Sequence, residues 1–487
     1  MKVGSGIKKN FVFQVVYKIM SMALPFITSP YIARTIGAEG IGAYSYSSTI
    51  ANYFVIFSML GLSNYGNREI AMSRDNKKKL DHIFSSLIYA HMFVSVPVVC
   101  LYVIYATHFA SSKIYAIVQL IYVLSGLCNI SWFYFGLEKF RLTVGLSMVL
   151  KVINLFSIFL LVKRPEDLIL YCVIMAGGIL TEQILLWIPI KRYTNFVMVS
   201  KKEIIAHMKP MVILFIPVIA VSVYKYMDKI MIGYFCDRIQ LGFYENGEKL
   251  VNMPMAIIVS FGTVMMPMMS NLAAKNSLRD SQIYISYSFR YIMCLAFGLA
   301  FGLSAISNVF APLFWGDEFR PCGNIIMILS LTVPFTSFAN ILRTQYLIPQ
   351  KMDRQYLSSV VTGAIVNFCI NYLLIPSCGS IGASIGTVFA EFTVFFVQSV
   401  MLNRMLPIKD YISQCIPYLV IGVIMYSVVL GIGNIIPSIG WSGLVLQIMI
   451  GIGIYGTLSI MYLILIKDNM VTSIYKKIIG YISIVIN

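Results

Sequence analysis

The amino-acid sequence predicts an all-α protein that crosses a membrane about fourteen times. Of its 487 residues, 59% are hydrophobic and only 12% are charged, whereas soluble domains carry about 25% charged residues. Apolar stretches recur along the chain at about the 20 residues that a helix needs to cross the hydrocarbon core. The connections between these stretches are too short for a sizeable soluble domain. We therefore expect the functional site to lie among the membrane helices.

Six spans are expected in the first part of the chain. The apolar stretch that begins near residue 11 is too long for the hydrophobic region of a signal peptide, so we interpret it as the first span. The six spans cover residues 11–33, 41–62, 83–107, 115–136, 143–162 and 168–190.

Eight more spans are expected in the rest of the chain. Turn residues at 377–379 and at 434–440 each divide a long apolar stretch into two spans. Fusing one of these pairs would give thirteen spans instead of fourteen. The eight spans cover residues 211–234, 250–272, 287–311, 324–348, 356–376, 380–403, 411–433 and 441–466.

The connection at 191–210 is the best candidate for a hinge, because it is as long as any that we expect on the inner side and it divides the first six spans from the next eight. Gly177 precedes Glu182 by five residues, and Gly386 precedes Glu391 by five, which indicates a parallel repeat of the first six spans by the next six. The predicted domains are an N-terminal six-helix bundle at 1–192, a cytoplasmic linker at 193–210, a C-terminal six-helix bundle at 211–403, and two additional helices with a cytoplasmic tail at 404–487.

The chain is basic, with 37 Lys and Arg, 20 Asp and Glu, and a formal net charge of +17. In a soluble protein this balance would suggest a nucleic-acid partner, but membrane proteins collect Lys and Arg in their cytoplasmic loops. The connections at 63–82 and 191–210 hold five such residues each, while those at 34–40 and 108–114 hold one each. This alternation predicts that both termini are cytoplasmic, and we expect no nucleic-acid partner.

No motif in the sequence indicates catalysis. The nine cysteines form no CxxC pair, and the four histidines form no HExxH or similar spacing. The sequence contains no P-loop, and no nucleophile-elbow or paired-carboxylate motif supports hydrolysis or group transfer. We expect no metal and no cofactor, and a transporter instead of an enzyme.

Ionisable residues inside membrane spans are costly and usually face a bundle interior or a wet cavity. With Arg290 at the start of the span 287–311 counted in the adjacent connection, the expected spans contain five cations and three acids. This leaves a net positive interior that suits an anionic passenger such as a phosphate or pyrophosphate group. The cations are Lys18, Lys151, Lys225, Lys229 and Arg343, and the acids are Glu182, Asp228 and Glu391.

Each of these groups also has a structural interpretation. Asp228 with Lys225 or Lys229 could be an ion pair that only braces the helices, and Glu182 and Glu391 could be protonated core carboxyls. Arg343 could extend to the inner surface. The hypothesised substrate-binding residues are Lys18, Lys225, Lys229, Arg343, Lys151 and Arg34. The hypothesised ion-coupling or charge-balancing residues are Asp228, Glu391 and Glu182, and the expected polar cavity lining is Gln14, Asn52 and Asn154.

Three stretches carry a family resemblance. Residues 27–71 read ITSPYIARTIGAEGIGAYSYSSTIANYFVIFSMLGLSNYGNREIA, which contains the patterns PYxxRxxGxxGxGxYS at 30–45 and YGxRE at 65–69. The other two stretches are YKYMDKIMIG at 224–233 with GFYENGEKL at 242–250, and LIPSCGSIGASIGTVFAEF at 374–392. Together they resemble bacterial oligosaccharide flippases of the Wzx type, in the polysaccharide transporter branch of the multidrug/oligosaccharidyl-lipid/polysaccharide exporter superfamily.

The resemblance implies two six-helix bundles around a central cavity, followed by two C-terminal helices. It also implies the substrate, an undecaprenyl-pyrophosphate-linked oligosaccharide moved from the inner to the outer leaflet of the bacterial cytoplasmic membrane by alternating access. The product would feed O-antigen, lipopolysaccharide or capsule assembly. Membrane lipids would be partners, and so could be a polysaccharide polymerase and a chain-length regulator.

Rival functions remain open at the level of sequence. A lipid II flippase, which moves the peptidoglycan precursor, belongs to the same superfamily. A drug exporter of that superfamily would need an acidic cavity to bind cations, whereas the interior expected here is net basic. A membrane-embedded glycan polymerase or acyltransferase would need a catalytic loop that the short outer connections do not offer.

Overall fold

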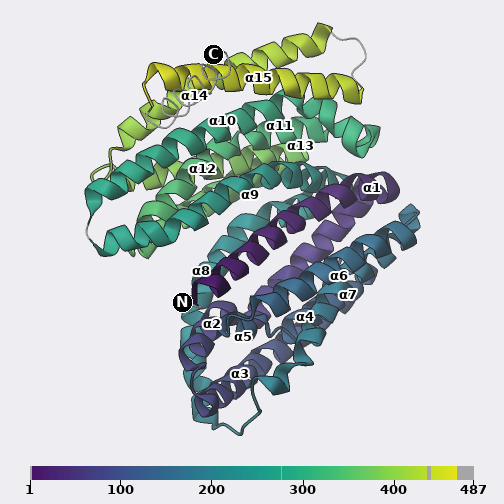
Figure 1. Ribbon diagram of the computed structural model, residues 1–487. Coiled ribbons are helices and arrows are strands. Elements are labelled where there is room, and N and C mark those ends of the chain that lie inside the picture. The colour runs from purple at the N-terminus through teal and green to yellow at the C-terminus, as the bar shows by residue number, and fades with distance from the viewer. Residues whose placement is uncertain (1–2, 276, 436–439, 469–487) are drawn as a thin grey trace, which may run out of the picture. The chain divides into compact units, whose positions relative to one another are not determined.

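A computed structural model describes residues 3–275, 277–435 and 440–468, with side chains from residue 24 onward except at Asn434. The described residues form α-helices and short 3-10 or π turns, and they contain no β-strand (Figure 1). This confirms the all-α prediction. The chain divides into two compact units, Met1–Glu245 and Asn246–Asn487, which we describe separately.

The first unit holds the N-terminal helices, and α4 contacts α1, α3 and α7 within it. Its elements are α1 (Val3–Met59), α2 (Leu62–Ser73), α3 (Lys77–Ile104), η1 (Tyr105–Phe109), α4 (Lys113–Leu127), α5 (Ser131–Gly136), α6 (Phe140–Leu161), η2 (Pro165–Asp167), α7 (Leu168–Trp187), η3 (Ile190–Arg192), α8 (Lys201–Phe235) and the start of α9 (Arg238–Ala274).

The second unit holds the rest of α9 and the following helices, and α10 contacts α11, α12, α14 and α15 within it. Its further elements are α10 (Leu278–Trp315), η4 (Asp317–Phe319), α11 (Cys322–Ser330), α12 (Thr332–Leu342), η5 (Arg343–Leu347), α13 (Asp353–Leu402), α14 (Ile408–Ile435) and α15 (Trp441–Leu465).

Two of the long helices are broken at a glycine. Gly37 in α1 has φ 71° and ψ 179°, and Gly379 in α13 has φ 58° and ψ −133°. Residues with a Cβ rarely adopt such positive φ values, so glycine is needed at both bends. The bend at Gly379 coincides with the break predicted at 377–379. The bend at Gly37 lies between the first two predicted spans.

Eleven helices among the described residues are long and apolar enough to cross a membrane. One of the eleven is α13, which contains two predicted spans on either side of Gly379. Large apolar side chains such as Phe93, Leu160 and Leu373 are each 71% exposed, as expected for surfaces that contact lipid. The chain is a multi-pass membrane protein, and the count of fourteen spans stays a prediction.

The predicted linker at 193–210 differs from the structure in two ways. Its second half is helical, because α8 begins at Lys201, where Ser200 and Glu203 form a capping box. In addition, α8 contacts α1, α2 and α3 within the first unit, so the boundary between compact units falls after Glu245 and not at 193–210. The division into two six-helix bundles remains a proposal.

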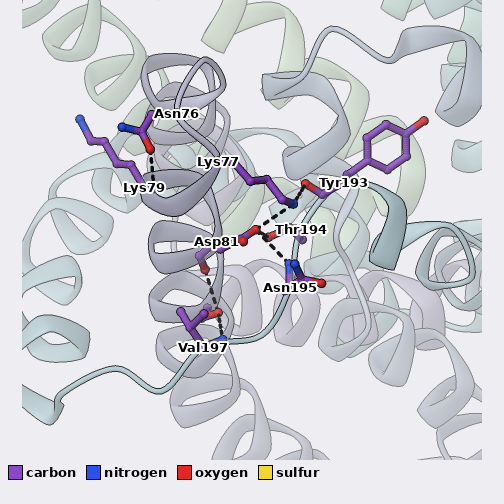
Figure 2. A network of polar contacts seen from close by, with 9 residues as sticks. Asn76, Lys77, Lys79, Asp81, Tyr193, Thr194, Asn195 and Val197 are labelled. Atoms are coloured by element: carbon purple, nitrogen blue, oxygen red, sulfur yellow. Dashed lines mark hydrogen bonds and ion pairs between the residues drawn. The ribbon is translucent and has the colours of Figure 1, made fainter.

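The extended segment before α8 is fastened to α3 by a network of hydrogen bonds (Figure 2). The carboxylate oxygen Oδ1 of Asp81 accepts from Thr194 Oγ1 at 2.8 Å and from the backbone N–H of Asn195 at 2.9 Å, and it lies 3.0 Å from Lys77 Nζ. Ser85 Oγ accepts from the backbone N–H of Val197 at 2.9 Å. Residues 194–197 are therefore anchored within the first unit.

Candidate functional site

A polar cavity of about 220 Å³ lies within the first unit, between helices that are predicted to span the membrane. It is lined by Tyr44, Ser45, Ser48, Thr49 and Asn52 of α1, Gln119 and Tyr122 of α4, Ala176 and Ile179 of α7, Tyr226 and Lys229 of α8, and Glu245 of α9. Ser45, Ser48, Thr49 and Asn52 recur every three or four residues, so the helical repeat brings these four polar side chains to one face of α1.

The charged groups among the described residues that line the cavity are Lys229 and Glu245. Lys229 Nζ lies 2.7 Å from Glu245 Oε2, and both side chains are 12% exposed. Ser45 Oγ donates a hydrogen bond of 2.7 Å to the same carboxylate oxygen. A buried charge is tolerated when it is paired and hydrogen-bonded, and this pair therefore brings a net charge of zero into the cavity wall.

Two amide side chains in the cavity wall have unused hydrogen-bonding capacity. Asn52 Oδ1 accepts a hydrogen bond of 2.9 Å from the Tyr122 hydroxyl, but Asn52 Nδ2 is buried without a partner. Gln119 is 1% exposed, and its Nε2 is also buried without a partner. Buried donors in proteins are almost always satisfied, so these two nitrogens are suited to a bound ligand or water.

Asp228, one of the predicted coupling residues, is 4% exposed on α8 and accepts a hydrogen bond of 2.7 Å from the Tyr244 hydroxyl of α9. Lys225, one turn earlier on α8, is exposed, and its Nζ lies 5.4 Å from the centre of the Tyr226 ring. Asp228 and the ion pair of Lys229 with Glu245 thus tie α8 to the start of α9 at two successive positions.

Lys151 and Glu182 form a second polar group, at the contact of α6 with α7. Ser147 hydrogen-bonds to the Glu182 carboxyl, and the charge of Lys151 acts on the same carboxyl. Asn154 lies further along α6 against Gly178, where a Cβ would be only 2.1 Å from Asn154 Nδ2. None of these residues is among those lining the cavity.

The remaining predicted residues lie in other parts of the structure. Arg34 is exposed on α1. Arg343 starts η5 in the second unit, donates to Asn340 Oδ1 at 2.6 Å, and lies 5.8 Å from the centre of the Tyr356 ring. Glu391 is half-buried on α13. Lys18 and Gln14 belong to α1, and their side chains are outside the described residues.

Of the twelve predicted site residues, the structure therefore brings Asn52 and Lys229 into one cavity. Sequence reasoning missed Glu245, Gln119, Tyr122 and Tyr226. The predicted spans 211–234 and 250–272 leave Glu245 in the connection between them, but α9 already begins at Arg238. Glu245 is therefore a helical residue, and it is 9% exposed. One feature of the sequence could have identified Glu245, because residues 242–250, which resemble the family pattern, include it. No group of three or more His, Cys, Asp or Glu in the described chain could hold a metal ion.

Comparison with known proteins gives one family match. The model of a family described as "Polysaccharide biosynthesis protein" matches residues 7–273, which is more than half of the chain.

Two curated relatives extend over most of the sequence. A protein of Shigella dysenteriae named as a candidate O-antigen transporter is 22% identical over 390 residues, which cover 79% of this chain and 97% of the relative. A protein of the same name from Escherichia coli strain K12 is 20% identical over 405 residues, which cover 82% of this chain and 96% of the relative.

Among solved structures, the lipid II flippase MurJ in an inward closed conformation superposes with a TM-score of 0.77 at 15% identity, covering 93% of this chain and 99% of that chain. A point mutant of the MATE transporter VcmN of Vibrio cholerae superposes with a TM-score of 0.50 at 11% identity, covering 82% of this chain and 98% of that chain. At these identities the two superpositions establish the fold alone.

Proposed function

Because the chain belongs to the polysaccharide biosynthesis protein family, we propose that it transports an undecaprenyl-pyrophosphate-linked oligosaccharide across the bacterial cytoplasmic membrane. The direction would be from the inner to the outer leaflet, and the product would serve O-antigen, lipopolysaccharide or capsule assembly. The single observation that carries this proposal is the polar cavity among membrane helices, in a chain whose relatives named as O-antigen transporters align over about four fifths of its length.

A water-accessible polar cavity lowers the cost of taking sugar hydroxyls into the bilayer, because those groups would otherwise lose their hydrogen bonds. The polyprenyl tail needs no such site, since it is already soluble in the hydrocarbon core. We therefore propose alternating access, in which the polar head passes through the protein while the tail stays in lipid. A polysaccharide polymerase and a chain-length regulator would act on the product.

The ion pair changes the expected role of Lys229. The pyrophosphate group would have to compete with the Glu245 carboxylate, which already lies 2.7 Å from Lys229 Nζ. Binding of pyrophosphate through the predicted cations Lys18, Lys225, Lys151, Arg34 and Arg343 stays a proposal. Coupling to an ion or proton through Asp228, Glu391 or Glu182 is also a proposal.

A leaflet-resolved flipping assay tests the function. The purified protein is reconstituted in liposomes that contain a fluorescent undecaprenyl-pyrophosphate-linked oligosaccharide, and the fraction of sugar exposed to an added glycosidase is followed with time. We expect exposure of the inner-leaflet pool to exceed that of protein-free liposomes. Equal rates with and without protein would contradict the proposal.

The second candidate function is that of a lipid II flippase. It is considered because the solved structure of MurJ, a lipid II flippase, superposes on 93% of this chain. The same liposomes loaded with labelled lipid II discriminate between the two. Faster flipping of lipid II than of the oligosaccharide-linked lipid would favour this alternative, and depletion of the protein would then stop growth.

A further inference from the structure

The cavity in the first unit has walls that suit a neutral polar ring more than an anion. Three tyrosines, Tyr44, Tyr122 and Tyr226, line it together with the amides of Asn52 and Gln119. A tyrosine side chain combines an apolar ring face with a polar hydroxyl. Sugar rings have the same two characters, a C–H face and a rim of hydroxyls, so these side chains can contact both parts of one ring.

Charge argues in the same direction. Lys229 and Glu245 are the charged residues of the described lining, and they lie 2.7 Å apart. A pyrophosphate that entered this space would meet the Glu245 carboxylate next to the cation it needs, and like charges repel strongly at low dielectric. A neutral ligand would leave the ion pair intact.

Two residues that line the cavity carry amide donors without a partner. Gln119 Nε2 and Asn52 Nδ2 are both donors without a partner, and hydroxyl or acetamido oxygens of a sugar are acceptors. The volume of about 220 Å³ is far above the roughly 10–15 Å³ that one water molecule needs. This is room for one sugar ring.

We propose that this cavity binds one neutral sugar ring of the transported lipid, with Asn52 and Gln119 as specificity-determining donors, while the pyrophosphate is bound elsewhere. The inference rests on the proposed function, and it adds the chemical group that this cavity recognises. Loss of either donor should weaken the complex with a sugar-bearing lipid and leave the complex with a sugar-free lipid unchanged, because only the first contacts the amides.

The test measures binding to purified full-length protein in a detergent without a sugar headgroup. The probes are undecaprenyl pyrophosphate, the same lipid carrying one galactose, the same lipid carrying one N-acetylglucosamine, and the two free monosaccharides. The wild-type protein should bind at least one sugar-bearing lipid about fivefold or more tightly than the sugar-free lipid. Since a single hydrogen bond in a binding site contributes about fivefold to tenfold, Gln119→Leu and Asn52→Leu should each remove most of that preference.

Two further variants separate recognition from folding. Gln183→Leu is the matched control, because Gln183 is buried at 5% exposure in the same unit, is paired with Ser131 and does not line the cavity. It should keep the wild-type preference. Tyr122→Phe removes only the hydroxyl that donates to Asn52, so it should fold normally and reduce the preference by a smaller factor.

The outcomes are distinct. If the wild-type protein binds lipids with and without sugar equally, the sugar site is wrong, although the transport proposal stands. If Gln119→Leu weakens both kinds of lipid to the same extent, the cavity holds the pyrophosphate and the inference is also wrong. Tighter binding of a free monosaccharide than of the sugar-bearing lipid would show a site for soluble sugar and overturn the assignment. If no lipid binds to the wild-type protein, the proposed function fails together with this inference.

Discussion

Lys229 of α8 and Glu245 of α9 form an ion pair of 2.7 Å in which both side chains are 12% exposed. The pair lies in a cavity wall within a chain that spans a membrane, and Ser45 of α1 donates to the same carboxylate. Three helices are therefore joined at one carboxylate. The pair explains why a positively charged residue is stable at this position and why its charge is not freely available to an anion.

The first prediction concerns the energy of this pair. Glu245→Gln and Lys229→Met should each lower the free energy of unfolding by about 3 kcal/mol, because each removes one partner of a buried ion pair. The double variant should be less destabilised than the sum, with a coupling energy of about 1–3 kcal/mol. The wild type, the two single variants and the double variant form a double-mutant cycle. Unfolding of the four purified proteins by a denaturing detergent measures their stabilities.

Lys225→Met is the matched control for that cycle. Lys225 belongs to the same helix as Lys229, but it is exposed and its Nζ lies 5.4 Å from the centre of the Tyr226 ring. Its replacement should change the free energy of unfolding by less than about 1 kcal/mol. Strictly additive effects of the Lys229 and Glu245 substitutions would show that the pair has no energetic coupling.

The second prediction concerns the close contact of α1 with the start of α9. A Cβ at Gly42 would lie 1.7 Å from the Arg238 carbonyl oxygen, and a Cβ at Gly242 would lie 2.0 Å from the Ala38 carbonyl oxygen. Backbone atoms cannot yield as a flexible side chain can. Gly42→Ala and Gly242→Ala should therefore force the helices apart, and we expect a loss of about 1–3 kcal/mol or more in stability, measured by thermal unfolding.

Gly145→Ala is the control for the glycine substitutions. Gly145 is in α6, and a Cβ there would have no neighbour within 4 Å. Alanine favours a helix over glycine by about 1 kcal/mol, so this variant should be as stable as the wild type or slightly more so. A Gly42→Ala protein with an unchanged melting temperature would mean that the contact is not maintained in the membrane.

The third prediction concerns the anchor of the segment before α8. Asp81→Ala removes the acceptor for Thr194 and Asn195, and hydrogen bonds to a charged group contribute about 1.5–3 kcal/mol. The segment should then open locally, and trypsin should cut faster after the exposed Lys201 and Lys202. Mass spectrometry of the fragments measures the rate at each site.

Asp81→Asn separates the hydrogen bonds from the charge. The amide keeps an oxygen that can accept from Thr194 and Asn195, but it loses the ion pair with Lys77. We expect a cleavage rate between those of the wild type and Asp81→Ala. Equal rates for all three proteins would show that the network does not hold the segment.

The fourth prediction concerns topology. The concentration of Lys and Arg in alternate connections predicts that both termini are cytoplasmic. Reporter fusions should therefore place Asp75 and Ser200 inside and Ala110 and Gln240 outside. An outside signal for any position between 191 and 210 would overturn this orientation.

Several features of the fold were predictable because they depend on local sequence. The backbone hydrogen bonds of a helix are formed within the segment itself, and the bilayer requires every one of them to be made. Apolar stretches and turn residues therefore predicted the helices and the bend at Gly379. The family pattern at 30–45 also contains two glycines that the structure requires. Gly37 has a positive φ, and Gly42 lies in close contact with the backbone of α9.

The identity of the cavity was decided by tertiary structure. The sequence determined that Lys229 is a cation inside a membrane helix, but its pairing with Glu245 depends on where α9 starts and how α8 and α9 pack. Ser45 is 200 residues from the carboxylate that it contacts, and Asn52 is 70 residues from its donor Tyr122. No local pattern encodes such contacts, because helix packing selects which polar faces meet and therefore which charge is neutralised and which donor is left for a ligand.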